Sequence, residues 1–370
     1  MGSKSEYAQA GVDYEKIGPF KRAMVDVGKR TLRFPNRRYV FAASNAHGAT
    51  FEYRGNHPHI WCNVQEELGN KNWIAEWMYQ FAGTGRTYYE NIGVDAALMA
   101  VNDVIAQGAM PVVYTDEVAA GDSEWFEDEK RAQALADGFY RVCKEVGMAL
   151  PAGESPSLRY LVKAEPPVCS APSLSGCVTG IIVPRTRFIS GKGLRAGDSI
   201  IGVTSSGLHA NGASLVIKRA LAMPDKFLTR LPNDNSLGEE ALIPTRSYVA
   251  LVEALLDAGV RVRAFLPGTG GGVAKVAFDK RPFTYRIHSW VGVPIIFQLM
   301  LEIGVPIKDC LTTFNWGIGY YVFVSKSEAS RTIEIGTKAG YEMMEVGRVE
   351  KGDREVIFEP EGITLPPPGE

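Results

Sequence analysis

The stretch IGVDAALMAVNDVIAQGAMP, residues 92–111, decides how the first half of this chain should fold. Its apolar side chains recur every three or four residues, which predicts a helix over residues 92–107 that ends at Gly108. Pro111 then opens a short apolar run that predicts a buried strand. One face of the predicted helix is polar, because Asp95 and Asn102 are seven residues apart and Asp103 lies beside them.

Helices and strands alternate on both sides of this stretch. Residues 124–146 predict a second amphipathic helix closed by Gly147, and residues 176–183 predict a strand. A polar, glycine-containing segment at residues 185–197 indicates a domain boundary. Beyond it, strands are predicted at 200–204, 317–324, 344–349 and 356–358, and helices at 213–221, 248–258 and 328–339. The pattern predicts an α/β (α+β) protein with two domains, residues 1–186 and 187–370.

The two ends of the chain lack such periodicity. The first 60 residues predict a partly extended arm with one strand at residues 39–43. The tail from Leu365 through three consecutive prolines should stay outside any sheet and fray, since proline cannot donate a ladder hydrogen bond.

Composition excludes several classes of protein. The 370 residues are 45% hydrophobic and 22% charged, with a formal net charge of −2 and no long run of like charges, which argues against a nucleic-acid partner. The five cysteines contain no CxxC pair, which argues against a disulfide framework and a zinc site. The N-terminus has no apolar signal core, Glu6 stands where N-acylation needs Ser or Thr, and the longest apolar stretch is too short for a bilayer. We therefore expect a soluble, cytoplasmic protein without a membrane partner.

Two segments besides residues 92–107 could carry chemistry. The oxygen ligands of that helix could hold Mg²⁺. The alternative is that Asp95 is only a favourable first-turn acid and that Asn102 and Asp103 are solvated. The stretch SSGLHANG, residues 205–212, lies between a predicted strand and a helix, where backbone N–H groups can bind a phosphate. His209 and Asn211 would add side-chain hydrogen bonds. The alternative is a tight turn in which Asn211 caps the helix.

The third segment is GTGGG, residues 268–272, whose glycines accept backbone angles that other residues reject. It matches neither the dinucleotide nor the P-loop signature, so a ligand loop and a structural turn both remain open.

Glu154 follows a strand-like run and could be an ordinary exposed acid. His57 and His59 have no third ligand nearby, which makes a metal site there improbable.

The order of these segments along the chain is more specific than any one of them. The segments are AGVDY (10–14), residues 92–111, GE (153–154), GD (197–198), SSGLHANG (205–212), PTRSY (244–248), TGGG (269–272) and TFNWGIG (313–319). In this order, over nearly the whole chain, they resemble the phosphoribosylformylglycinamidine cyclo-ligase family, also called aminoimidazole ribonucleotide synthetases. PTRxY and TFNxGxG distinguish it from relatives such as selenophosphate synthetase and thiamine-monophosphate kinase.

This resemblance implies a fold and an activity. The N-terminal domain would bind ATP and pair its strands with those of a second subunit in a dimeric barrel, beside a C-terminal α+β domain. The enzyme would be an ATP-dependent ligase of purine biosynthesis that converts formylglycinamidine ribonucleotide to aminoimidazole ribonucleotide. ATP would phosphorylate the amide oxygen, and a ring-closing nitrogen would then expel phosphate.

The resemblance also implies cofactors, ATP and Mg²⁺, and roles for individual residues. The implied catalytic residues are Lys71, Asp103, Glu154 and His209. The implied cofactor-binding residues are Gly69, Lys71, Asp95, Asn102, Asp116, Asn211, Gly270, Gly271 and Gly272. The implied metal ligands are Glu66, Asp95 and Asp103.

Three departures from the family pattern lie in these loops. The segment Gln65 to Lys71 replaces the family's Thr-Asp-Gly-Val-Gly-Thr-Lys, with Glu66 standing in for the aspartate. Pro267 occupies the position of a family histidine, whose donor and acid–base functions proline cannot supply. Ser157 replaces a second glutamate. The alternatives are therefore a related enzyme of the same fold that phosphorylates a different substrate, or an inactive nucleotide-binding paralogue.

Overall fold

The computed structural model describes residue 8, residues 10–44 and residues 50–368. The residues considered above for N-acylation lie outside this part. The chain divides into two compact units, which are described separately: unit 1 is residues 1–104 and 111–181, and unit 2 is residues 105–110 and 182–370. Among the described residues, no helix combines the length and hydrophobicity that crossing a bilayer requires.

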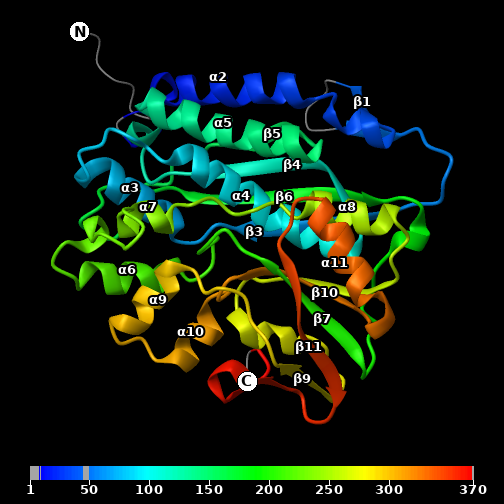
Figure 1. Ribbon diagram of the computed structural model, residues 1–370. Coiled ribbons are helices and arrows are strands. Elements are labelled where there is room, and N and C mark those ends of the chain that lie inside the picture. The colour runs from blue at the N-terminus through cyan, green and yellow to red at the C-terminus, as the bar shows by residue number, and fades with distance from the viewer. Residues whose placement is uncertain (1–7, 9, 45–49, 369–370) are drawn as a thin grey trace, which may run out of the picture. The chain divides into compact units, whose positions relative to one another are not determined.

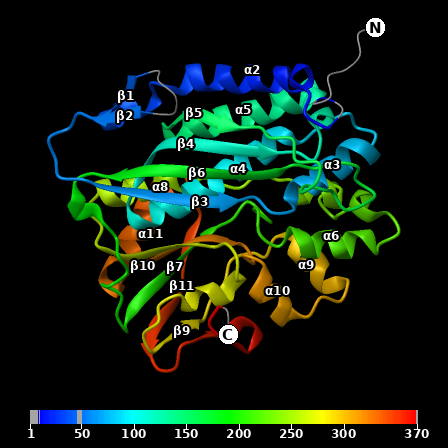
Figure 2. The ribbon, with the colours of Figure 1, turned by 180° about the vertical axis from the view of Figure 1, so that it is seen from behind.

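Unit 1 is built on a four-stranded sheet, whose strands can be followed in Figure 2. Its strand order is β3 (Ile60–Glu67), β6 (Ser173–Ile182), β4 (Met110–Ala119) and β5 (Ala149–Glu154). β4 and β5 are parallel, with Asp116 opposite Gly153 and Glu117 opposite Glu154. Their carboxyl ends therefore bring acidic side chains to one edge of the sheet. A separate antiparallel pair is formed by β1 (Val40–Ser44) and β2 (Thr50–Tyr53).

The two helices predicted for unit 1 are confirmed. α4 (Tyr89–Val104) continues as one 3₁₀ turn, η2 (Ile105–Gln107), and Gly108 follows with a φ of 79°. α5 (Glu129–Val146) ends at Gly147, whose φ of 74° gives the left-handed C-cap. The predicted start of this helix at residue 124 is wrong, because η3 (Ser123–Glu127) forms a separate 3₁₀ turn and Asp128 caps α5.

The N-terminal region is not the extended arm that we expected. It contains α2 (Tyr14–Thr31), an 18-residue helix that lies along α5 and β5 (Figure 1). Asp13 caps its first turn, and its buried side chains are spaced at helical intervals. Pro19 within the helix and the many charged residues conceal that spacing in the sequence. β3 and α3 (Lys71–Phe81) were likewise not predicted as elements.

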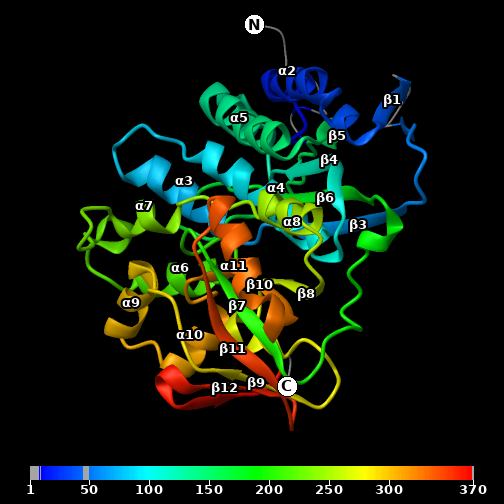
Figure 3. The same ribbon diagram turned by 45° about the vertical axis from the view of Figure 1, so that its right-hand side comes forward.

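Unit 2 is built on a seven-stranded sheet. Its order is β13 (Ile363–Leu365), β12 (Glu355–Phe358), β9 (Phe283–Ile287), β11 (Met343–Lys351), β7 (Asp198–Thr204), β10 (Ile318–Ser325) and β8 (Val262–Pro267). Neighbouring strands are antiparallel except β12 and β9. The helices are α6 (Ala213–Leu221), α7 (Leu237–Ala241), α8 (Val249–Asp257), α9 (Ile295–Glu302), α10 (Ile307–Thr313) and α11 (Ala329–Lys338). α8 and α11 lie side by side (Figure 3), and α11 packs against β7, β10 and β11.

The C-terminal tail corrects a second expectation. Leu365 belongs to β13, pairs with Val356 and is fully buried. Pro367 is also buried. The prolines end the strand because they lack an N–H donor, but their apolar rings still pack onto unit 2.

Candidate functional site

Lys71 and Asp95 form a buried ion pair in unit 1. The Lys71 Nζ lies 2.7 Å from the Asp95 Oδ2, and both side chains are completely buried. Lys71 opens α3 just after Gly69, whose φ of 73° reverses the chain, and Asp95 projects from α4. Burial lowers the pKa of Lys71, against the opposing effect of the Asp95 charge. The predicted contact of Lys71 with ATP phosphates stays a prediction, because the Lys71 side chain is completely buried against Asp95 in this structure.

The other predicted ligands of unit 1 lie on α4 and β3. Asn102 is 5% exposed, so the alternative in which it is solvated is wrong. Asp103 and Glu66 are half-buried. Within the described part of the chain, no group of three or more His, Cys, Asp or Glu side chains is arranged to hold a metal ion. Mg²⁺ needs only one or two carboxylates, so the assignment of Glu66, Asp95 and Asp103 stays a prediction.

Asp116 and Glu154 converge from adjacent parallel strands. Asp116 is 6% exposed, and its Oδ1 has no hydrogen-bond partner among the described residues. Burial, reinforced by the charge of Glu154, raises the pKa of Asp116 to about 7, while its own backbone hydrogen bond opposes the rise. A Cβ on Gly153 would collide with this carboxyl group, so glycine is needed opposite it. Only the family resemblance pointed to Asp116, although an acid at the end of a buried strand was visible in the sequence.

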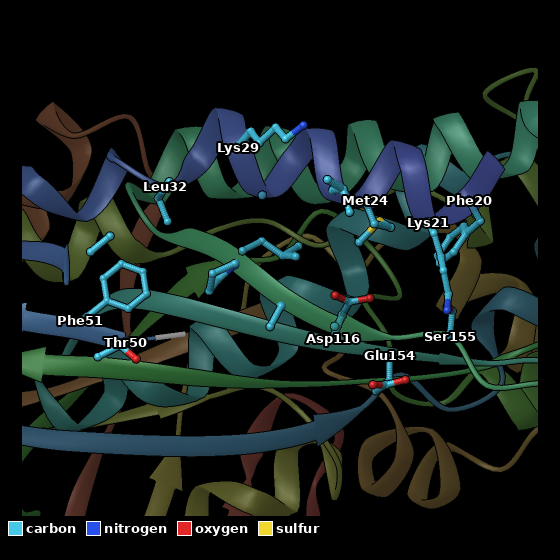
Figure 4. Close-up of a pocket in the computed structure, with 17 residues that line it drawn as sticks. Phe20, Lys21, Met24, Lys29, Leu32, Thr50, Phe51, Asp116, Glu154 and Ser155 are labelled. Carbon is cyan, nitrogen blue, oxygen red and sulfur yellow. The ribbon is translucent and has the colours of Figure 1, made fainter. Parts of the chain in front are cut away.

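A cavity of about 430 Å³ opens beside these two carboxylates (Figure 4). Its walls come from α2, β1, β2 and β5, with Asp116 and Glu154 at one side. The rest of the lining combines apolar side chains with two lysines and a few hydroxyl groups. Besides the two acids, the residues labelled in the figure are Phe20, Lys21, Met24, Lys29, Leu32, Thr50, Phe51 and Ser155. A second hollow of about 300 Å³ shares the two carboxylates and adds Gln65 and Glu117. The α2 residues were missed because that region gave no helical signal.

In unit 2, His209 is held by its own loop. It is 6% exposed and adopts a φ of 56°, a left-handed conformation that non-glycine residues seldom take. The Ser206 N–H donates to the His209 Nε2 at 3.2 Å, and the Ser206 Oγ donates to the Pro244 carbonyl at 2.6 Å. The SSGLHANG and PTRSY segments are therefore joined directly.

The glycine segment of unit 2 adjoins this loop. The Asn211 Nδ2 lies 3.5 Å from the position that a Cβ on Gly270 would take. The alternative in which Asn211 caps α6 is wrong, because Gly212 is the N-cap and no side chain caps the helix. Gly271 and Gly272 have φ values of 92° and 57°, which favour glycine.

The sheet of unit 2 tolerates a proline where the family has a histidine. Pro267 is the last residue of β8, which is an edge strand of the sheet. β8 has a neighbouring strand on one side only, so the missing N–H of the proline interrupts no second set of strand hydrogen bonds. Lys275, in the 3₁₀ helix η6 (Gly272–Ala277), donates from its Nζ to the Thr269 Oγ1. Unit 2 thus brings together the predicted residues His209, Asn211 and Gly270 to Gly272, while Lys71, Asp95, Asp116 and Glu154 belong to unit 1.

These features define a class of protein with two α/β units and without a P-loop. Residues 78–182 match the family model described as "AIR synthase related protein, N-terminal domain", and residues 195–359 match the corresponding C-terminal domain. Phosphoribosylformylglycinamidine cyclo-ligase of Pyrococcus horikoshii is 32% identical over 361 residues, covering 97% of this chain and 99% of that protein. The proteins of the same name from Pyrococcus furiosus (31%; 93% and 94% covered) and Alkaliphilus oremlandii (35%; 73% and 78% covered) are also similar. The chain belongs to the phosphoribosylformylglycinamidine cyclo-ligase family.

Solved structures confirm the fold. The hydrogenase maturation protein HypE of E. coli superposes with a TM-score of 0.61 at 15% identity, covering 94% of this chain and 97% of HypE. Thiamine-monophosphate kinase from Stenotrophomonas maltophilia gives a TM-score of 0.62 at 17% identity, with 92% and 97% covered. At these identities the likeness shows the fold alone, and it is the AIR synthase-like fold predicted from the sequence.

Proposed function

We propose that the chain is an ATP-dependent cyclo-ligase that converts formylglycinamidine ribonucleotide to aminoimidazole ribonucleotide. The observation that carries this proposal is the 32% identity to a cyclo-ligase over 97% of the chain. In this reaction the amide oxygen attacks the γ-phosphorus of ATP and ADP leaves. The ring-closing nitrogen then attacks the activated carbon, and the oxygen departs with phosphate. The protein supplies positioning and charge stabilisation.

Asp116 and Glu154 fit the role of Mg²⁺ ligands for the nucleotide. Asp116 has a buried carboxylate oxygen without a hydrogen-bond partner among the described residues, Glu154 is exposed beside it, and both border the 430 Å³ cavity. Hard oxygen donors of this kind suit Mg²⁺, which would neutralise charge on the transferred phosphoryl group. The cavity has apolar walls that suit a nucleobase, and Lys21 and Lys29 offer positive charge for phosphate.

The loops of unit 2 are proposed to bind the ribonucleotide. Ser205 to Gly212 and Gly268 to Gly272 lie against each other, and their glycines and small residues can turn backbone N–H groups toward a phosphate. His209 and Asn211 supply the side-chain hydrogen bonds. Replacing His209 with Ala should raise the KM for the ribonucleotide more than that for ATP.

A homodimer is part of this proposal. One face of the unit 1 sheet carries small polar side chains: the Thr179 Oγ1 donates to the Asn63 Oδ1, and the Ser173 Oγ donates to the Glu67 Oε1. Trp61, on β3, is 42% exposed. A second copy that paired with this face would cover these side chains. Light scattering should then give twice the chain mass of 40.4 kDa, and a monomer would contradict the dimer.

The decisive experiment measures ADP release from Mg-ATP with and without formylglycinamidine ribonucleotide, and follows aminoimidazole formation in parallel. Substrate-dependent ADP matched by aminoimidazole supports the cyclo-ligase. ATP binding without aminoimidazole would contradict it and indicate a relative that phosphorylates another substrate, which the absence of a donor at Pro267 would explain. No nucleotide binding at all would indicate an inactive paralogue.

A further inference from the structure

Asn315 is a buried hydrogen-bonding centre between two loops of unit 2. Its side chain is 4% exposed. The amide Nδ2 donates to the carbonyl oxygens of Gly207 at 2.8 Å and Leu208 at 3.4 Å. The amide oxygen accepts from the Ser205 Oγ at 3.1 Å and from the Gly317 N–H at 2.9 Å. Each end of the amide therefore makes two hydrogen bonds, and three of the four fix the segment just before His209.

This segment makes a direct hydrogen bond to the His209 ring. The Ser206 N–H donates to the His209 Nε2, so Nε2 carries a lone pair and the ring proton lies on Nδ1. The ring also requires space beside β10, because a Cβ on Gly319 would lie 2.6 Å from the His209 Cε1 and would collide with the Tyr248 Oη. Gly319 admits the ring, and the Ser205–Leu208 backbone orients its nitrogens.

We propose that Asn315 is a positioning residue that acts through the Gly207–Leu208 backbone to hold His209 in the Nδ1-protonated tautomer. The inference rests on the proposed function in one respect: the ribonucleotide is taken as the ligand that this loop binds. Asn315 touches neither substrate nor ATP in this role. A ring held in one tautomer presents one fixed donor and one fixed acceptor, which a freely rotating ring would not.

The substitution Asn315→Asp isolates the positioning effect. It keeps the oxygen that accepts from Ser205 and Gly317 but places a carboxylate oxygen against the carbonyls of Gly207 and Leu208. We expect the KM for the ribonucleotide to rise about tenfold, as loss of a buried hydrogen bond predicts, with the KM for ATP changed less than about twofold. Thr284→Val is the matched control: it removes the 2.9 Å hydrogen bond to the Asp353 carbonyl elsewhere in unit 2 and should leave both KM values unchanged. Equal changes in both KM values, or the same pattern in the control, would overturn the inference.

Nitrogen-15 NMR of histidine-labelled protein tests the tautomer without any activity. His209→Asn identifies the His209 signals among those of five histidines. Wild-type protein should show a protonated Nδ1, and Asn315→Asp should shift the ring toward tautomer exchange. A protonated Nε2 in the wild type, or an unchanged ring in Asn315→Asp, overturns the positioning inference even if the enzyme is active. A shifted ring in a chain that forms no aminoimidazole supports the inference and contradicts only the proposed function.

Discussion

Unit 1 contains two buried acids whose surroundings differ sharply. Asp95 is completely buried and is neutralised by Lys71 at 2.7 Å. Asp116 is nearly as buried, yet one of its oxygens has no hydrogen-bond partner among the described residues, and its neighbour Glu154 carries the same charge. The first acid has its counter-charge built into the fold. The second has no counter-charge of this kind, and it lines a cavity.

The two acids are suited to different roles. A buried ion pair can be a structural element, whose loss exposes an uncompensated charge to the core. A buried acid at a cavity, with a raised pKa and no cationic partner, is instead typical of a functional position. On this reasoning we propose Asp116 and Glu154 as better candidates for Mg²⁺ than Asp95. Asp95 stays a predicted metal ligand, and Lys71 stays a predicted contact of the ATP phosphates.

Breaking the Lys71–Asp95 pair should have the largest effect on stability. Asp95→Asn leaves the Lys71 charge buried without its counter-ion, so we expect the free energy of unfolding to fall by about 3–5 kcal/mol. Replacing both residues, Lys71→Met with Asp95→Leu, should recover most of that loss. Urea unfolding measures each variant.

The control for this series is Glu334→Gln, which breaks an exposed ion pair with Lys338 and should change the urea midpoint little. Asp95→Asn could instead unfold at the same urea concentration as the wild type and no longer be stabilised by Mg-ATP. The pair would then belong to the nucleotide site, and its structural role would be wrong.

Much of the fold was predictable from the sequence for a simple reason. α4, α6, α8 and α11 have regular apolar spacing, and glycines such as Gly108 and Gly147 mark helix ends with a positive φ that few other residues adopt. α2 was not predictable in this way, because Pro19 lies inside it and its contacts with α5, η3 and β5 define its buried face. Tertiary packing, rather than local propensity, stabilises that helix.

The candidate site was less predictable because it depends on contacts between distant residues. The pairing of Lys71 with Asp95 joins two helices, and helical spacing within α4 gives no sign of it. The burial of Asp116 depends on Gly153, on the neighbouring strand, which leaves room for the carboxyl group. The sequence indicates which residues are acids, whereas strand register and burial determine which acid lacks a counter-charge.

Neutralising Asp116 should have the opposite effect on stability from neutralising Asp95. Its folded-state pKa is raised from 3.8 to about 7, so the folded protein holds a proton that the unfolded chain releases between these values. Wild-type stability should therefore decline as pH rises from about 4 to about 7, by roughly 3–4 kcal/mol from this group, and Asp116→Asn should lack that decline. Urea unfolding at pH 5 and pH 8 measures the difference.

The same variant should lose the rise in melting temperature that Mg-ATP gives the wild type. Glu145→Gln is the control, since Glu145 is an exposed acid of α5 in the same unit and lines neither hollow. A stability profile for Asp116→Asn that parallels the wild type would mean that Asp116 titrates normally. The contrast with Asp95 would then disappear.

The smallest expected effect concerns the neighbouring acid. Burial is the largest cause of the raised pKa of Asp116, and the charge of Glu154 adds to it. Glu154→Gln removes that charge, so the pKa of Asp116 should fall, but by less than about one unit because the carboxyl group stays desolvated. Carbon-13 NMR titration of the Asp116 carboxyl group in both proteins gives the shift. A return of the pKa to about 3.8 would show that repulsion from the Glu154 charge, rather than burial, is the main cause of the raised pKa of Asp116.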